Sequence, residues 1–320
     1  MRSVLRCIYS LLNARRLWPL GIGLQTSILA IAPPEQENKD MVLNLAPKAF
    51  ALVAFLALGT NPLSAAEKFI VVASTTSTVN SGLFENILPK FTKDTGIEVR
   101  VVGVGTGQAI RVAERGDADV LFVHHKKSEL AFVAKGFGVA RFDVMYNDFV
   151  VVGPSLDAAA AAKAISVADV YRRIAAAKST FLSRGDDSGT HKKSLEIWKQ
   201  AAIDVKKFSG KWYREAGSGM GATLNIAVSM NGYTLTDRST WQAFKNKGAL
   251  KLLFEGDPGL RNQYGIILVN PERHKHIKMG LASTFIDWVL SEPGQAAINR
   301  YRLAGRQTFF ANARVTGKLN

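Results

Sequence analysis

The chain has 320 residues, of which 47% are apolar and 21% charged, a composition typical of one large or two modest globular domains. Its 41 Lys and Arg residues outnumber its 26 Asp and Glu residues, giving a net charge of +15, but no basic run exceeds two residues and no stripe alternates aromatic with basic residues. This scatter argues against nucleic-acid binding and favours small anions as partners. Because Cys7 is the only cysteine, the chain can form no internal disulfide.

Residues 1–66 have the pattern of an export leader. From Met41 the sequence has a lysine, an apolar core of eleven residues that ends at Gly59, and small residues before Glu67. This order predicts a secretory signal peptide over 41–66, cleaved before Glu67. The apolar core is shorter than the roughly 20 residues of a membrane-spanning helix. We therefore expect a periplasmic protein, and we interpret the residues ahead of Met41 as the product of a mis-called start codon.

From Phe69 onward, short apolar runs alternate with amphipathic segments. Strands are expected at 69–75, 97–104, 120–125, 148–154, 180–184, 233–237, 250–256 and 264–270. Helices are expected at 83–94, 107–115, 128–135, 166–178, 189–202, 221–230, 239–247, 281–291 and 294–303. Such alternation predicts an α/β fold with mainly parallel sheets. The low-complexity stretch "DAAAAAKA" at 157–164 is expected to be a solvated helix or a linker.

Turns rich in Gly, Ser and Thr open four of the expected helices. They are "STTSTVNSG", "GTGQ", "GDDSGTH" and "GSGMGATLN". In open α/β sheets, ligands bind beyond the carboxyl ends of the strands. Helix N-termini in that position present unpaired N–H groups and a partial positive charge. The four turns therefore predict a convergent set of donors for an anion.

The first two turns supply the candidate donors nearest the N-terminus. Five hydroxyl residues follow one another from Ser74 to Thr78, which exceeds what helix capping needs, and a surplus of donors suits a desolvated oxyanion. "GVGTGQ" fits neither of the common nucleotide-binding glycine motifs, so a tight turn is expected there, with Thr106 and the Gly107 N–H facing the ligand. The candidates taken from these turns are Ser74, Thr75, Thr76, Ser77, Thr106 and Gly107.

The turn "RGDDSGTH" admits two interpretations. In a serine hydrolase, Ser188 would be the nucleophile and His191 its base, but "DDSGT" lacks the G-x-S-x-G pattern and a triad draws on separate elements. In an anion cradle, Arg184 offers a planar fork of donors, and Asp187 orients it or caps the helix. The cradle is the stronger interpretation. Its candidates are Arg184, Asp187, Ser188, Gly189 and Thr190, joined by Met220 and Gly221 at the next helix start.

No metal site or cofactor is expected. Apart from His191, the histidines occur as the pair His124–His125 and as His274 and His276. Neither group has carboxylates or a third histidine at ligand spacing, and solvent-facing histidines are more common than sites. We expect these histidines to be surface residues.

Several motifs together resemble one known family. They are "STTSTVNSGLFENILPKFTKDTGIEV", "VGTGQAI", "GDADVLFVH", "NDFVVVGP", "SRGDDSGTHKKSLEIWK", "WYREAGSGMGATLNIA", "YTLTDRSTW" and "YGIILVNP". In this order, from about Phe69 to about Arg302, they resemble the periplasmic tungstate-binding component of the Tup-type ABC importer. The family's threonine/serine motif falls on Ser74–Ser77, with serine at the first place where threonine is usual. Its arginine falls on Arg184.

The resemblance implies a type II periplasmic-binding-protein fold, with two α/β lobes, two crossover strands and an oxyanion in the interlobe cleft. The crossovers would be 147–154 and 264–270. Lobe one would then comprise 67–147 and 271–320, and lobe two 148–270. The implied partners are tungstate first and molybdate second, and the permease and ATPase subunits of an importer. The chain would act as a monomer and not as an enzyme.

Three other functions remain open from the sequence. A phosphate receptor would use the same donors but benefits from a carboxylate that accepts the ligand's proton. A serine hydrolase would use Ser188 and His191. The effector domain of a DNA-binding regulator is disfavoured by the leader and by the missing helix-turn-helix.

Overall fold

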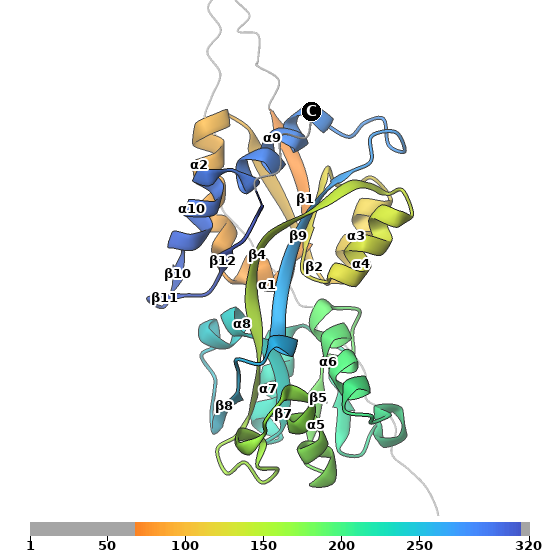
Figure 1. Cartoon of the computed structure of the whole chain (residues 1–320), viewed down its shortest axis with the longest axis vertical. Coiled ribbons are helices and arrows are strands. Elements are labelled where there is room, and N and C mark those ends of the chain that lie inside the picture. Colours follow the sequence, from red (N-terminus) through yellow and green to blue (C-terminus); the bar gives the residue numbers. More distant parts are fainter. Residues whose placement is uncertain (1–67, 315–320) are drawn as a thin grey trace, which may run out of the picture. The chain divides into compact units, whose positions relative to one another are not determined.

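The structure, a computed structural model, describes residues 68–314 (Figure 1). The expected leader and its cleavage point before Glu67 lie outside these residues. None of the helices within 68–314 has the length and hydropathy needed to cross a membrane. In chain order the elements are β1 (Phe69–Thr75), α1 (Thr76–Asn80), α2 (Leu83–Thr95), β2 (Glu98–Val104), α3 (Thr106–Glu114), β3 (Val120–Val123), α4 (Lys126–Ala134), β4 (Gly138–Pro154), η1 (Ala161–Lys163), α5 (Val167–Ala176), β5 (Phe181–Ser183), α6 (Gly189–Gln200), η2 (Val205–Phe208), β6 (Tyr213–Glu215), α7 (Met220–Ser229), β7 (Tyr233–Asp237), α8 (Arg238–Ala243), β8 (Leu250–Phe254), η3 (Pro258–Leu260), β9 (Arg261–Val269), α9 (Met279–Leu290), α10 (Glu292–Arg300), β10 (Arg302–Leu303), β11 (Arg306–Gln307) and β12 (Phe310–Ala311).

Every helix and strand expected from the sequence occurs, and the α/β class is confirmed. The largest boundary error is at β4, which begins at Gly138 instead of 148. Its first half carries Arg141 and Asp143, so it lacks the unbroken apolar run by which the second half was recognised. Helix α1 was missed because its five residues, "TSTVN", are too few to show a helical period. The stretch 157–164 is mostly turns, with the short η1 at its end.

The sheet explains how one chain forms two lobes. Its strand order is β2-β1-β3-β9-β4-β7-β5-β6. The strands at each end pair in parallel, β1 with β2 and β3, and β5 with β6 and β7. The two strands in the middle, β4 and β9, pair antiparallel with each other and with their neighbours. The expectation of mainly parallel sheets is therefore right for the outer strands and wrong for the two crossovers, which Figure 1 shows lying side by side.

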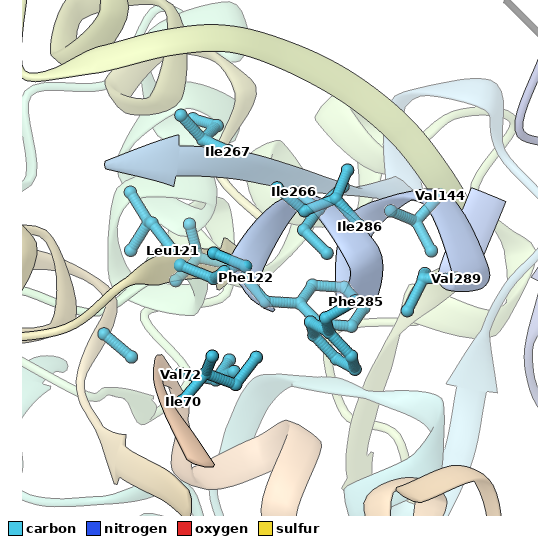
Figure 2. Close-up of a cluster of buried hydrophobic side chains, with 14 of the residues drawn as sticks. Ile70, Val72, Leu121, Phe122, Val144, Ile266, Ile267, Phe285, Ile286 and Val289 are labelled. Carbon is cyan, nitrogen blue, oxygen red and sulfur yellow. The ribbon is translucent and has the colours of Figure 1, made fainter. Parts of the chain in front are cut away.

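The buried side chains form separate cores. One contains residues between Ile70 and Met145 and between Tyr264 and Phe309. Figure 2 shows part of it, where Phe285, Ile286 and Val289 of α9 lie close to side chains of β1, β3, β4 and β9. The apolar face of α9 thus packs against the sheet at β1, β3, β4 and β9.

The other buried residues lie between Phe149 and Leu260, on two faces of the sheet. Phe149 and Val151 of β4 belong to one cluster and Val150 and Val152 to the other, as the two-residue period of a strand requires. We propose that these clusters and the first core mark the two lobes. On this division lobe two ends before β9, not after residue 270 as expected, since β9 packs in the first core.

Candidate functional site

The hydroxyl run at the end of β1 contains some groups that bond within the protein and others that line a cavity. Ser74 is fully buried, and its Oγ donates to the Phe122 carbonyl at 2.7 Å. Thr75 caps α1, since its Oγ1 accepts from the Thr78 N–H at 3.3 Å. The Ser77 Oγ lies 3.2 Å from Nε2 of His124. The hydroxyl proton of Ser74 is therefore engaged with β3. Of the candidates in this run, Thr76 and Ser77 line a cavity.

That cavity joins the first hydroxyl run to the start of α7. It has a volume of about 330 Å³. It is lined by Thr76, Ser77 and Asn80 of α1, by Gly219, Met220, Gly221 and Ala222 at the start of α7, and by Thr240, Ala243 and Phe244. The α7 N-terminus has no side-chain cap, and the neighbouring Ser218 Oγ is buried without a hydrogen-bond partner. Two of the expected donor clusters, far apart in sequence, thus share one cavity.

Arg184 lies at the end of β5 and is only 6% exposed. Its Nη2 donates to Asp186 at 2.6 Å, while its Nε is buried without a partner. Asp186 also accepts from the Oγ of Ser188 at 2.5 Å. The carboxylate that orients Arg184 is therefore Asp186, and the expectation of Asp187 in this role was wrong. Gly185, with φ of +63°, makes the turn that separates Arg184 from the two aspartates.

Asp187 faces the other way, toward α3. Its carboxylate lies 2.8 Å from Nη1 of Arg111 and 2.8 Å from Nζ of Lys192. Partial burial opposes ionisation, but the hydrogen bonds from Lys192 and Arg111 outweigh it and lower the pKa of Asp187. Its carbonyl accepts from the Gly107 N–H at 2.9 Å. Asp187 therefore ties α3 to α6, and its carboxylate is paired with Arg111 and Lys192 instead of Arg184.

A second hydrogen bond joins the same two helix starts. The Gly189 N–H donates to Oγ1 of Thr106 at 3.0 Å. A Cβ added at Gly107 would lie 1.6 Å from the Asp187 carboxylate, so glycine is required for this approach. Thr106 and Gly107 were expected to face the ligand, but here Thr106 accepts from Gly189 and Gly107 donates to the Asp187 carbonyl, which joins α3 to α6. Thr190 is buried in the first turn of α6 and lines none of the cavities described here.

A buried polar chain lies behind these groups, and most of it was missed from the sequence. His124, expected at the surface, is buried, with Nδ1 3.0 Å from the Asn262 side-chain oxygen. The Asn262 amide donates in turn to Asn147 at 2.7 Å. The Tyr264 hydroxyl and the Asn147 Nδ2 are buried without partners. The one available signal was that the apolar run "VLFV" leads directly into His124.

The donors at this site outnumber the acceptors. The buried polar atoms without a partner include the Arg184 Nε, the Ser218 Oγ, the Tyr264 hydroxyl and the Asn147 Nδ2, and each of these can donate. The nearby carboxylates are already engaged, since Asp237 accepts from the Thr240 N–H at 2.9 Å and from its Oγ1 at 2.6 Å. Such an arrangement suits a fully ionised anion.

The geometry does not form a serine nucleophile with its base. The Ser188 Oγ donates to Asp186 and accepts from the backbone N–H of His191 at 3.1 Å, as a helix cap does. The His191 ring instead has its Nδ1 2.9 Å from the Ser183 Oγ. His274 and His276 each contact a backbone carbonyl through Nε2. Across residues 68–314, no group of three or more metal-ligating side chains gathers.

His124 gives the protein a predicted pH dependence. Burial lowers its pKa from 6.5 to about 4, in spite of the opposing charge of Asp237. The unfolded chain therefore takes up a proton near pH 6.5 while the native state does not, so stability falls as the pH drops from 6.5 toward 4, by about 3 kcal/mol in all. In His124→Gln this loss should be absent. Urea unfolding of both proteins between about pH 7 and pH 4 checks it; equal slopes for the two would contradict it.

Comparisons with known proteins identify the family of the chain. The model of the PBP superfamily domain matches residues 60–293. The "Tungstate-binding protein TupA" of Peptoclostridium acidaminophilum is 46% identical over 234 residues, which cover 72% of this chain and 81% of the relative. A solved TupA from Desulfovibrio alaskensis G20 is 44% identical, with a TM-score of 0.67, and the match covers 77% of this chain and 100% of that one.

A second solved structure, described as the tungstate ABC transporter from Geobacter sulfurreducens, is 49% identical with a TM-score of 0.68. The match covers 73% of this chain and 99% of that chain. The family model matches most of the chain, and these relatives match it over most of their length. The two-lobe fold with its two crossover strands is therefore that of a type II binding protein. The chain belongs to the PBP superfamily, within the family of the TupA proteins.

Proposed function

We propose that this protein is the solute-binding component of an ABC importer and that it binds tungstate, with molybdate as the second ligand. The tungstate-binding relatives at 44–49% identity support the ligand. The observation that carries the proposal is Arg184, a guanidinium buried to more than nine-tenths whose Nε has no partner. Asp186 meets the guanidinium through Nη2, so the donor left over is the Nε–H, and a buried donor without a partner is costly unless a ligand accepts from it.

The proposed cradle has two sides. Thr76 and Ser77, together with the amides at the start of α7, face the cavity between them. We propose that Arg184, which lines neither of the two cavities described here, contributes the charge. Asp186, which accepts from the Ser188 Oγ, holds its guanidinium in place. Thr106, Gly107, Gly189 and Thr190 lie at the meeting of α3 and α6, where we propose that they close the cradle. Ser74, Thr75 and Asp187 are proposed to position these groups without donating to the anion.

The site should discriminate against phosphate. Phosphate near neutral pH carries a proton that needs an acceptor, but Asp186, Asp187 and Asp237 are all engaged with protein donors. An unpaired buried hydroxyl costs about 1–3 kcal/mol, so phosphate should bind about ten- to a hundredfold more weakly than tungstate. Calorimetric titration with tungstate, molybdate, sulfate and phosphate measures this. Phosphate affinity equal to that of tungstate would favour the phosphate receptor instead.

The cellular setting is proposed on the same basis. We propose a periplasmic protein released from its leader near Glu67, which delivers its anion to a permease with an ATPase subunit and works as a monomer. An enzymatic role is not proposed, since the Ser188 and His191 side chains are engaged elsewhere. Nor is nucleic acid a proposed partner.

A further inference from the structure

A second cavity, of about 280 Å³, is lined by His124, which also contacts Ser77 of the proposed cradle. Its walls come from both lobes: α4 with the residues before it, the first turns of α6, and the start of β9. Four permanent cations line it, Lys126, Lys127, Lys193 and Arg261, against one carboxylate, Glu196. We refer to it as the basic cavity.

The cations of the basic cavity form few contacts with carboxylates, although the charges of Glu196 and Asp257 act on Lys193. None of the four forms an ion pair with a carboxylate of residues 68–314; Arg261 lies over the ring of Tyr146 at 4.0 Å. Glu196 is nearest to His125, 3.5 Å from its Nε2. Lys193 is partly desolvated, and burial lowers the pKa of its ammonium group. Some exposed cations outside the basic cavity do pair, as Arg115 does with Asp117 and Arg173 with Asp169. Concentrated unpaired charge in a concave site attracts anions.

The basic cavity adjoins the proposed cradle at two residues. His124 lines it and contacts Ser77, which lines the cavity between α1 and α7. Gly189 lines it and donates to Thr106. The contact between α3 and α6 therefore separates an anion in the basic cavity from the cradle. This contact consists of few hydrogen bonds, so it can open more easily than a packed core.

We infer that the basic cavity is an entry subsite that takes a divalent oxyanion from solution before it reaches the cradle at Arg184. This inference rests on the proposed function. Lys126 and Lys127 are exposed, so water screens them and they hold an anion only briefly. Their effect is on the rate of association. The cradle, with its buried donors, determines the rate of release.

Stopped-flow tungstate binding, followed by tryptophan fluorescence, tests this inference. The variant is the triple substitution Lys126→Gln, Lys127→Gln and Lys193→Gln. Its matched control is Lys206→Gln, Lys207→Gln and Lys211→Gln, which removes the same charge from exposed lysines that do not line the basic cavity or the cradle cavity. At low ionic strength the variant should lower the association rate constant about three- to tenfold with an unchanged dissociation rate constant, and the control less than about twofold. At high salt the proteins should converge.

Three results would overturn the inference. An equal fall of the association rate constant in both triple variants would show that the net charge of the whole protein, and not the basic cavity, attracts the anion. A faster dissociation with an unchanged association rate would make the three lysines part of the final binding site. If the parent protein binds no tungstate at all, the proposed function fails; if the parent binds and both variants match it, only the entry subsite fails.

Discussion

Replacing Arg184 with alanine should weaken tungstate binding by at least ten- to a hundredfold while the protein remains folded. A charge-assisted hydrogen bond contributes about 1.5–3 kcal/mol, which corresponds to that range of affinity. Arg184 combines full charge, burial and an unpartnered Nε, so no other single residue should matter as much. Isothermal titration gives the affinity, and circular dichroism reports whether the fold is kept.

Two further variants separate charge from geometry. Arg184→Lys should restore only part of the affinity, because an ammonium group keeps the charge but loses the planar fork that Asp186 orients. Arg173→Ala is the matched control, since Arg173 forms a comparable ion pair with Asp169 on α5 at 2.8 Å but is partly exposed. An Arg184→Ala protein that binds tungstate like the parent would make Arg184 a structural residue, and the cradle would have to be placed elsewhere.

Gly107→Ala should weaken binding about ten- to a hundredfold by separating the two lobes at α3 and α6. The new methyl group would overlap the Asp187 carboxylate at 1.6 Å, and forced overlaps of this kind cost about 1–3 kcal/mol. Relief requires Asp187 to leave Arg111 and Lys192. Gly105→Ala is the control on the same loop, because no atom lies within 4 Å of a Cβ there and its φ of −67° suits alanine.

A double-mutant cycle tests the stated cause. Asp187→Ala should itself weaken binding, since it removes the ion pair with Arg111 that helps to hold α3 against α6. Adding Gly107→Ala to it should cost little more, because the overlapping carboxylate is already gone. Fully additive losses in titrations of the four proteins would show that Gly107 acts by another route, such as its N–H facing the anion.

The sequence predicted the elements better than the connections between side chains. Apolar periodicity identified every long helix, but it could not find α1, whose five residues have no apolar face. It also could not find the first half of β4, where Arg141 lies 2.6 Å from the buried Glu129 and so replaces apolar packing with an ion pair. Both failures arise where tertiary contacts, and not local pattern, stabilise the element.

The same limit applies to the site. Hydroxyl and glycine content identified Thr76, Ser77, Met220 and Gly221, which line one cavity. Sequence could not tell Asp186 from Asp187, because the direction of each depends on the turn at Gly185 and on Arg111 from another lobe. Nor could it place His124, since a histidine after a strand is buried or exposed according to what packs over it.

Crystals of the protein grown with tungstate would test the central claim most directly, since the anomalous signal of tungsten locates the anion. We predict one strong peak beside Arg184, with an anion oxygen about 2.7–3.1 Å from its Nε and others within the same distance of Thr76 or Ser77. A peak confined to the basic cavity, beside Lys126 and Arg261, or the absence of any peak between the lobes, would contradict the account.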